Sequence, residues 1–527
     1  MKGSWSTALQ ASAAASVLVL CGLLYSSLPP SPDQWLLDYT GWMITRGAVP
    51  YVTFVDGNWP VSHWLHALSV WLFGTTLYAW RIFDFLLMTG CAIAGAHLVR
   101  LLWGRAAGLW MLFLYPCLYI VNGPWFAGER DLAAANVQLV VLGAYWQGIT
   151  TRRLRWQIVA GLGVAFCGLI KPTFLLLGGV LALHAAIGAV CGRWSVRDAV
   201  AHVATAGAAS LAGLALGFGA LALQGASIES FFDAAVRSVT VRYGNDVRGI
   251  SESVRHLVEA YRVSWHWIGA GAAASLAFHL RVGGRKDLPV NLLFPGMWAA
   301  GAVSYFVQGQ ALGYTIGPMW VATVPILCAG LGAATNGIHT SRGWRRTALV
   351  LCLALTVGLT GKKVLGAYES SLRWWSGQLT DEEYYARWLV GDGIDVATAL
   401  ALSAELSQRV DPGSTILVWG RANAINVLAQ RPQPTRFHHF VTVARSYLPV
   451  DIAERWNRWF EEDLEKNKPS YCLVNPEFLE GASEPRPRAT LFLEGYLRDN
   501  YTPIRKVGPS TLYERREPSR QDPQRPR

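Results

Sequence analysis

Residues 199–223 read AVAHVATAGAASLAGLALGFGALAL, a run of small and aliphatic side chains that contains no Asp, Glu, Lys or Arg. A helix needs about 20 predominantly apolar residues to cross the hydrocarbon core of a bilayer. This run is long enough to do so, and it therefore predicts a transmembrane helix.

Similar apolar runs recur along the chain, and together they predict a polytopic α-helical membrane protein with about eleven transmembrane helices. The predicted spans are residues 8–28, 78–99, 106–122, 132–149, 156–170, 173–191, 199–223, 264–280, 289–307, 311–333 and 347–361. The composition agrees, because only 15% of the residues are charged, against roughly 25% in soluble proteins.

The C-terminal part of the chain has a different character. Residues 364–527 have ordinary charge density, and strand-like runs such as 415–420 and 471–474 alternate there with helical patterns. We expect a membrane domain at 1–363, a soluble α/β domain at 364–515 and a disordered tail at 516–527.

Basic residues between the predicted spans orient the chain. Cytoplasmic connections of membrane proteins are enriched in Lys and Arg. With the N-terminus inside, the outer connections carry only Arg46, Arg81, Arg130 and Lys171, apart from the long mixed-charge loop 224–263. The inner connections carry Lys2, Arg100, Arg105, Arg152, Arg153, Arg155, Arg193, Arg197, Arg281, Arg285, Lys286, Arg342, Arg345 and Arg346. We expect a multi-pass protein of the plasma (inner) membrane with a cytoplasmic N-terminus and an extracytoplasmic, periplasmic C-terminal domain.

Three other features of the sequence bear on the assignment to a multi-pass membrane protein. A cleaved signal peptide is the alternative for residues 8–28, but its apolar region is usually only about 7–15 residues long. The net charge of +11 lies in small clusters between apolar runs, which argues against a nucleic-acid partner. The eight cysteines form no CxxC or metal-ligand spacing, so no metal site is predicted and a divalent-metal requirement is left open.

The outer loop between the first two spans contains two expected helices that do not cross the membrane. Ser31 is placed as an N-cap, followed by Pro32, and Gln34 is placed to complete a capping box. On this helix we expect an exposed polar face with Gln34 and Asp38, opposite a buried aromatic face. Residues 61–73 are too short to span, and their apolar side chains share one helical face, so they should lie in the interface plane.

Asp33 has two interpretations. An acid in the first turn of a helix stabilises that helix by a few tenths to about 1 kcal/mol. A carboxylate fixed on a rigid helix at a membrane surface can also orient or deprotonate an acceptor hydroxyl. Spacing alone does not separate the two.

Short stretches of this loop carry a family resemblance: Asp33-Gln34-Trp35, Thr45-Arg46-Gly47-Ala48-Val49-Pro50-Tyr51, Phe54-Val55-Asp56, Pro60 and Leu72-Phe73-Gly74. They resemble the first extracytoplasmic loop of the GT-C glycosyltransferases, in the protein O-mannosyltransferase and lipid A aminoarabinose transferase branch. The resemblance implies that Asp33 is the catalytic carboxylate. Gln34 stands where the family has Glu, and Trp59, after Asn58, stands where the aminoarabinose branch often has Lys.

The second outer loop places Glu129, Arg130 and Asp131 at the same membrane face as Asp33. Charges at the end of a span are often only boundary markers, but the resemblance implies a second catalytic acid at Asp131. Arg130 could meet a lipid phosphate. Lys171 either snorkels to the surface or pairs with the same phosphate.

Other polar positions are candidates for the cavity or the acceptor. In the first loop and its neighbour they are Gln34, Asp38, Asp56, Asn58 and Glu129. Near the tenth predicted span, Gln310 and Tyr314 lie in a stretch that resembles the family's polar entry to a late span. Asp84 is expected to contact a neighbouring helix rather than a substrate. The loop 224–263 carries mixed charges and is expected to be solvated, although one of its arginines could clamp phosphate.

One stretch of the C-terminal domain also carries the resemblance. Trp419-Gly420 and the segment Arg431-Pro432-Gln433-Pro434-Thr435-Arg436-Phe437 resemble the C-terminal domains of bacterial members of this superfamily. Arg436, His438 and His439 either contact an acceptor or form a packed turn.

The resemblance implies a glycosyltransferase that moves a hexosyl or pentosyl group from a polyprenyl-phosphate donor of the undecaprenyl or decaprenyl type. The acceptor would be an extracytoplasmic lipid, glycan or protein, and membrane lipids would be partners. The absence of a Gly-rich nucleotide loop agrees with a lipid-linked donor. One alternative is a transporter or flippase of lipid-linked sugars, for which repeated halves and midplane charges are expected and not found. An inactive membrane scaffold is the other, and the departures from the family pattern at Gln34 and Trp59 keep that alternative open.

Overall fold

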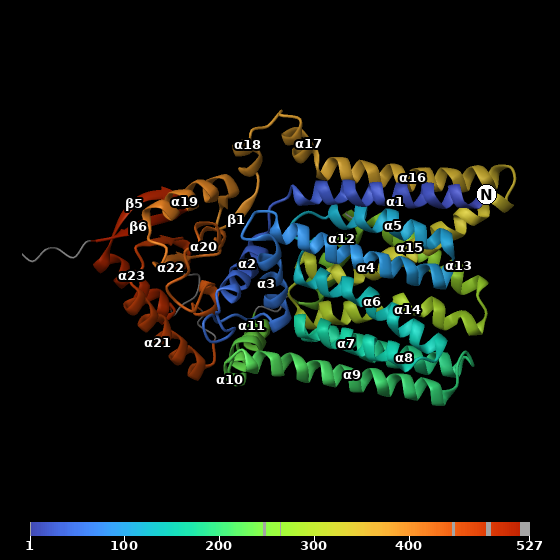
Figure 1. Cartoon of the computed structure of the whole chain (residues 1–527), viewed down its shortest axis with the longest axis horizontal. Helices are drawn as coiled ribbons and strands as arrows, with labels where there is room; N and C mark the ends of the chain where they lie inside the picture. The colour runs from blue at the N-terminus through green and yellow to red at the C-terminus, as the bar shows by residue number, and fades with distance from the viewer. Residues whose placement is uncertain (1, 246–248, 264, 445–447, 481–485, 517–527) are drawn as a thin grey trace, which may run out of the picture.

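The computed structural model describes the chain except for residues 1, 246–248, 264, 445–447, 481–485 and 517–527. A bundle of long helices forms one end of the molecule and a small α/β domain forms the other, with the first outer loop between them (Figure 1). The predicted disordered tail falls outside the described residues, apart from Arg516.

Each predicted span coincides with a helix of the bundle, because each apolar run buries its backbone hydrogen bonds within one element. These helices are α1 (Lys2–Ser26), α4 (Ala79–Trp103), α5 (Arg105–Ile120), α6 (Arg130–Thr151), α7 (Leu154–Ile170), α8 (Leu176–Val190), α9 (Val196–Leu223), α13 (His266–Val282), α14 (Leu288–Gln308), α15 (Gly317–Thr340) and α16 (Trp344–Ala367). Among the described residues, seven helical segments are long and apolar enough to cross a membrane, and three shorter apolar helices accompany them. The chain is a multi-pass membrane protein, and the count of eleven spans stays a prediction.

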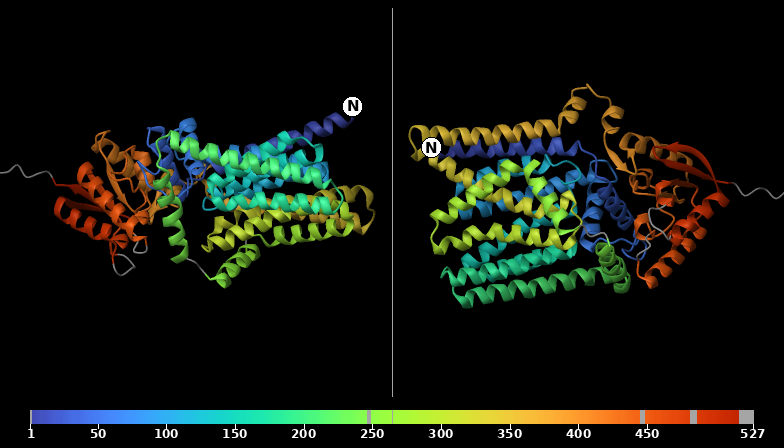
Figure 2. Two further views of the ribbon diagram at one scale, coloured as in Figure 1. Left: turned by 90° about the horizontal axis from the view of Figure 1, so that it is seen from below. Right: turned by 180° about the vertical axis from the view of Figure 1, so that it is seen from behind.

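The N-terminus lies at the end of the bundle far from the α/β domain, as Figure 2 shows from two further sides. An odd number of spans requires the N-terminus and the C-terminal domain to lie at opposite ends of the bundle. Which end faces the cytoplasm stays a prediction.

Asp84 makes the interhelical contact expected from the sequence. Its carboxylate accepts hydrogen bonds from the hydroxyls of Tyr25 on α1, at 2.8 Å, and Tyr119 on α5, at 2.9 Å. The buried Arg81 donates to the Tyr25 hydroxyl and to the carbonyls of Pro29 and Ala127. This network holds the start of the first outer loop and the end of the second against the bundle.

The first outer loop forms α2 (Pro32–Thr45) and α3 (Pro60–Phe73). The capping box of Ser31 and Gln34 is confirmed. The expected exposed face of α2 is wrong, because Gln34, Asp38 and Gly41 are buried. The reason is tertiary: α3 covers one side of α2, and Trp35, Tyr39 and Trp42 pack into the core of the α/β domain on the other.

The helix α3 presents its apolar residues outward. Trp71 is 73% exposed and Leu72 49%, whereas Ser62, His66 and Ser69 on the opposite face are buried against the protein. An outward apolar face is what a helix lying in the membrane interface needs. Its placement in the interface stays a prediction.

The long outer loop forms α10 (Ile228–Phe231), the π-helical turn η2 (Phe232–Arg237), α11 (Ser238–Asn245) and α12 (Ile250–Val263). The expectation of a solvated loop is wrong for its first part, since Asp233 is buried and pairs with Arg237 and with Arg455 of the α/β domain. Arg237 also pairs with Asp451 at 2.9 Å. These ion pairs attach the loop to the α/β domain, and no arginine among them is available as a phosphate clamp.

The α/β domain contains a four-stranded sheet of order β3-β4-β6-β5, in which β3 and β4 run parallel and the other neighbours antiparallel. The strands are β3 (Ile416–Trp419), β4 (Tyr471–Val474), β5 (Tyr501–Val507) and β6 (Ser510–Arg515), and β1 (Leu389–Gly391) pairs with β2 (Ile394–Asp395) separately. Its helices are α17 (Glu369–Trp375), α18 (Asp381–Tyr385), α19 (Val396–Arg409), α20 (Ala424–Ala429), α21 (Val450–Asn467), α22 (Glu477–Glu480) and α23 (Arg488–Asn500). The domain also contains the short helical turn η5 (Phe440–Thr442), and the bundle contains the turns η1 (Pro172–Leu175), η3 (Arg285–Asp287) and η4 (Gly313–Ile316). The strands β3 and β4 are buried along their whole length, which explains their continuous apolar sequences.

Candidate active site

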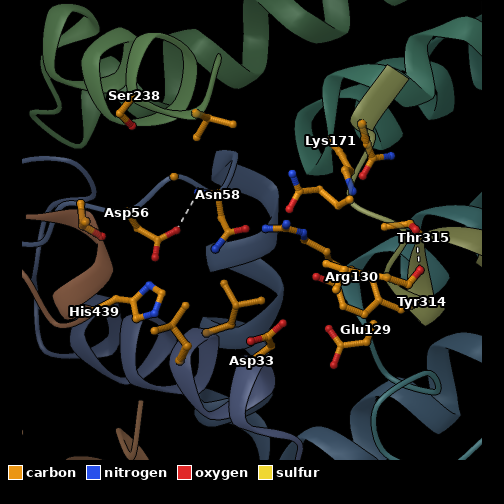
Figure 3. A pocket seen from close by; sticks show the side chains of 18 of the residues that line it. Asp33, Asp56, Asn58, Glu129, Arg130, Lys171, Ser238, Tyr314, Thr315 and His439 are labelled. Carbon is orange, nitrogen blue, oxygen red and sulfur yellow. Dashed lines mark hydrogen bonds between the residues drawn. The ribbon is translucent and has the colours of Figure 1, made fainter. Parts of the chain in front are cut away.

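A polar cavity of about 140 Å³ lies where the bundle, the first outer loop and the α/β domain meet (Figure 3). Nine of the residues proposed from the sequence line it: Asp33, Asp56, Asn58, Glu129, Arg130, Lys171, Gln310, Tyr314 and His439. Ser238, Gln308, Thr315 and Thr442 also line it. The cavity therefore collects charged groups from segments far apart in sequence.

Asp33 is half-buried in the first turn of α2, on the rim of the cavity. The cap fixes its backbone, because the Ser31 hydroxyl accepts from the Gln34 N–H and the Gln34 side chain accepts from the Ser31 N–H. Neither Asp33 nor its neighbours needs to rearrange for the carboxylate to face the cavity.

Gln34 does not line the cavity. Its amide group donates to Glu129 Oε1 at 3.1 Å and to the carbonyls of Pro124 and Ala127. The Ser31 hydroxyl donates to the same Glu129 oxygen at 2.7 Å. The cap of α2 therefore holds Glu129 in place, and a Gln at position 34 supplies the donor that a Glu could not.

Glu129 is 3% exposed and lies at the N-terminus of α6. Burial and the nearby negative charge of Asp33 raise the pKa of Glu129 to about 8, against the smaller opposing effect of the Ser31 hydrogen bond. The raised pKa favours the protonated form of the Glu129 carboxyl. In that form the carboxyl can donate a hydrogen bond to an oxygen in the cavity.

Lys171 reaches the cavity because Pro172 ends α7 and the chain becomes extended at Lys171. Its ammonium group donates to both oxygens of Asp131, at 2.8 and 3.0 Å. Asp131 is completely buried and is absent from the cavity wall. The sequence had suggested Asp131 as a second acid facing the pocket, but its carboxylate is engaged by Lys171 and lies behind it.

Arg130 is the second cation of the cavity. Its Nε lies 3.8 Å from Asp131 Oδ2, so one buried carboxylate positions both cations. In Figure 3 the Arg130 side chain extends into the middle of the cavity, between Asp33 and Glu129 on one side and Lys171 on the other.

Asp38 also lies outside the cavity wall. Its carboxylate is 2.7 Å from Nδ1 of His66 on α3, and both side chains are buried. It joins α2 to α3 and is not available to an acceptor. The proposal of a cavity position for Asp38 assumed an exposed helix face that α3 in fact covers.

A buried histidine pair surrounds Asp56, and sequence reasoning did not single it out as a unit. Nε2 of His438 lies 3.2 Å from Asp56 Oδ2, and Nε2 of His63 lies 3.8 Å from Oδ1. Burial opposes ionisation of Asp56, but His438, His63 and the Asn58 N–H hold its pKa well below the usual range. Burial lowers the pKa of His63 to about 4. In the sequence, the only sign of this arrangement is the His438-His439 doublet, and it does not show that Asp56 is the partner of His438.

The amide nitrogen of Gln310 is buried at the cavity and has no hydrogen-bond partner among the described residues. Arg436, by contrast, forms a bidentate ion pair with Asp463 and does not line the cavity. His439 lines the cavity directly. Of the candidates Arg436, His438 and His439, only His439 therefore lines the cavity, and Thr442 joins it from the same domain.

The sequence matches no family model and no curated protein. Solved structures share its fold. ArnT from Cupriavidus metallidurans bound to undecaprenyl phosphate superposes with a TM-score of 0.61 at 14% identity, over 97% of this chain and 98% of that chain. The same protein in the apo state gives 0.54. An oligosaccharyltransferase from Archaeoglobus fulgidus, in complex with Zn and sulfate, gives 0.50 at 11% identity over 88% of this chain and 68% of that chain.

The similarity extends over almost the whole chain, through the helical bundle and the α/β domain alike. The chain has the GT-C fold of membrane-embedded glycosyltransferases.

Proposed function

We propose that the protein is a glycosyltransferase that moves a sugar from a polyprenyl-phosphate donor to an acceptor outside the cytoplasm. The observation that carries the proposal is the cavity itself, where Asp33 faces the cations Arg130 and Lys171 at one end of the bundle. Its fold neighbour from Cupriavidus metallidurans was solved bound to undecaprenyl phosphate. A phosphate on a lipid carrier is an anion that such a cation pair is suited to hold.

The carboxylate of Asp33 and the two cations have complementary roles in a displacement at the anomeric carbon of the donor sugar. Asp33 accepts the proton of the acceptor hydroxyl, and the hydroxyl oxygen forms a bond to the anomeric carbon. The bond from that carbon to the phosphate oxygen breaks, and the polyprenyl phosphate leaves with the electron pair. Arg130 and Lys171 stabilise the negative charge that develops on it. Inversion at the anomeric carbon is the expected outcome.

Asp131 has an indirect role in this proposal. It is a positioning residue that holds Lys171 at 2.8 Å and keeps both cations beside the phosphate. Glu129, whose pKa is raised by burial, supports the phosphate or the acceptor with a hydrogen bond from its protonated form. Asp56, Asn58, Gln310, Tyr314 and His439 form the remaining wall that contacts the acceptor or the sugar.

The cavity position fits a lipid-linked donor. A long polyprenyl chain leaves the bilayer only at a large cost in exposed apolar surface, so its head group must be met at the membrane surface. We place residues 1–363 as the catalytic membrane domain and 364–515 as an extracytoplasmic domain of a plasma (inner) membrane protein. The membrane helix α16 continues to Ala367, slightly past that boundary.

The test is transfer of radiolabelled sugar from a panel of polyprenyl-phosphate hexoses and pentoses by the protein in nanodiscs. The Asp33→Asn variant should lose roughly 100- to 10,000-fold in turnover, the usual contribution of a general base. Asp411→Asn, an exposed aspartate of the α/β domain, is the matched control and should be fully active. Full activity of Asp33→Asn would remove Asp33 from the mechanism, and assays with and without EDTA decide the open question of a divalent metal.

A further inference from the structure

A second cavity, of about 390 Å³, lies in the α/β domain at the carboxyl ends of the parallel strands β3 and β4. Its wall is formed by Asp392, Arg421, Asn475, Glu477, Phe478 and Pro509, none of which lines the active-site cavity. Loops at the carboxyl ends of parallel strands are where α/β sheets most often bind ligands. The volume lies within the range of small-molecule sites.

The cavity contains a carboxylate held in place by an unusual backbone. Asp392 has a left-handed φ of 54°, between Gly391 at 138° and Gly393 at 70°. Such a conformation is uncommon for a residue with a side chain and costs free energy. The Asp392 carboxylate accepts a hydrogen bond of 2.5 Å from the backbone N–H of Arg421. A Cβ at Gly420 would lie 1.9 Å from Asp392 Oδ2, so only glycine allows this approach.

One oxygen of this carboxylate is left without a donor. Asp392 Oδ1 is shielded from solvent and has no hydrogen-bond partner among the described residues. An acceptor held in this way costs free energy until a donor reaches it. A donor group of a ligand in the cavity would satisfy Oδ1.

The chemistry of the wall selects a class of ligand. Glu477 and Asp392 accept hydrogen bonds, Arg421 donates them, and Phe478 and Pro509 supply apolar surface. Two carboxylates disfavour an anion, and the guanidinium group of Arg421 disfavours a metal cation. A sugar matches, because its hydroxyls both donate and accept while its C–H face packs on an aromatic ring.

One aromatic contact joins the second cavity to a segment that lines the active-site cavity. The ring of Phe478 stacks on that of Phe440, with centroids 4.1 Å apart and planes 24° apart. The residue before Phe440 is His439, and His439 and Thr442 both line the active-site cavity. The two cavities are therefore joined by one layer of side chains within the α/β domain.

We propose that this second cavity binds a neutral saccharide and serves as a subsite for a glycan acceptor. The assignment to the acceptor rests on the proposed transferase function, whereas saccharide binding itself does not. It narrows the acceptor, among lipid, glycan and protein, to a molecule that carries sugar units beyond the one that reacts.

The experiment measures binding and transfer separately, with the full chain in nanodiscs. Saturation-transfer difference NMR is recorded with methyl glycosides of mannose, glucose, galactose and arabinose. Glu477→Gln and Arg421→Ala change exposed side chains, and melting curves check that each variant folds. Each should weaken glycoside binding roughly tenfold, the effect of losing a hydrogen bond to a charged group. Glu454→Gln, an exposed glutamate of the same domain, is the control and should bind as the unmodified protein.

The outcomes separate the two proposals. Saturation transfer that weakens in Glu477→Gln but persists unchanged in Asp33→Asn supports the subsite, even if no sugar transfer is detected and the transferase proposal fails. Where transfer occurs, Glu477→Gln should raise the KM for a glycan acceptor and leave kcat nearly unchanged. Absence of saturation transfer with every glycoside, or equal signals from both cavity variants and the control, would overturn the subsite. Stabilisation by Ca²⁺ alone would do the same and assign the cavity to a cation.

Discussion

Variants of the buried ion pair between Lys171 and Asp131 allow its contribution to stability to be measured separately from its contribution to catalysis. The Lys171 ammonium lies 2.8 Å from an aspartate with no exposed surface, and the lysine side chain is itself only 8% exposed. Removal of one partner from such a pair leaves an uncompensated buried charge and costs about 3–5 kcal/mol. Replacement of both partners by apolar residues of similar size is often neutral or stabilising.

We therefore expect Lys171→Met and Asp131→Leu each to lower the free energy of unfolding by about 3–5 kcal/mol, and the double variant to recover most of that loss. Activity should follow a different pattern. The double variant is stable but lacks the cation beside the phosphate, so its transfer rate should stay at least roughly 100-fold low, as for other groups that stabilise developing charge.

The assay combines thermal unfolding in nanodiscs with sugar transfer by each variant. The exposed pair of Arg488 with Glu461, 2.7 Å apart, is the control, and its removal should cost at most about 1 kcal/mol. A double variant that is both stable and fully active would refute the role of Lys171 on the phosphate. Single variants as stable as the control would refute the reasoning about burial.

The remaining predictions concern pH, packing and orientation. Since the folded pKa of Glu129, about 8, lies above its ordinary value of 4.5, its contribution to stability is complete below about pH 4.5, falls as pH rises to about 8 and is constant above that. Glu129→Gln should remove that slope from the pH dependence of urea unfolding; an unchanged slope would contradict the assignment. Gly41→Ala should destabilise the protein by roughly 1–3 kcal/mol, because the added Cβ would lie 2.5 Å from the His66 backbone, whereas Gly90→Ala, with open space around it, should be neutral or slightly stabilising in the same melting assay. In a background without native cysteines, Asp411→Cys should react with an impermeant maleimide on intact cells and Arg342→Cys only after permeabilisation; the reverse pattern would invert the predicted orientation.

Local features of the sequence were sufficient for much of the fold. The membrane helices follow from the length of each apolar run, because a helix in a bilayer must satisfy its own backbone. The capping box of Ser31 and Gln34 is confirmed because all of its atoms lie within one turn. The strands β3 and β4 were evident for the same reason, as both are short, continuously apolar and bounded by turn residues.

The resemblance to a known loop directed attention to the right region, and nine of the candidate residues named from the sequence line one cavity. It did not separate the side chains that face that cavity from those just behind it. Gln34 and Glu129 are both buried, but only Glu129 lines the space, and Gln34 holds it there. The helix α2 has an amphipathic pattern, but its polar face is covered by α3 and the second outer loop, and its aromatic face packs into the distant α/β domain.

The sequence by itself determined which segments enter the membrane, which form the soluble sheet and which short loops carry the charged groups. Only the tertiary structure decided that Lys171 neutralises Asp131 and that His438, from the α/β domain, approaches Asp56 in the first outer loop. The physical reason is range: hydropathy and helix capping depend on neighbours within a few residues, whereas the ionisation and direction of a buried charge depend on whichever side chain the fold brings within about 4 Å of it.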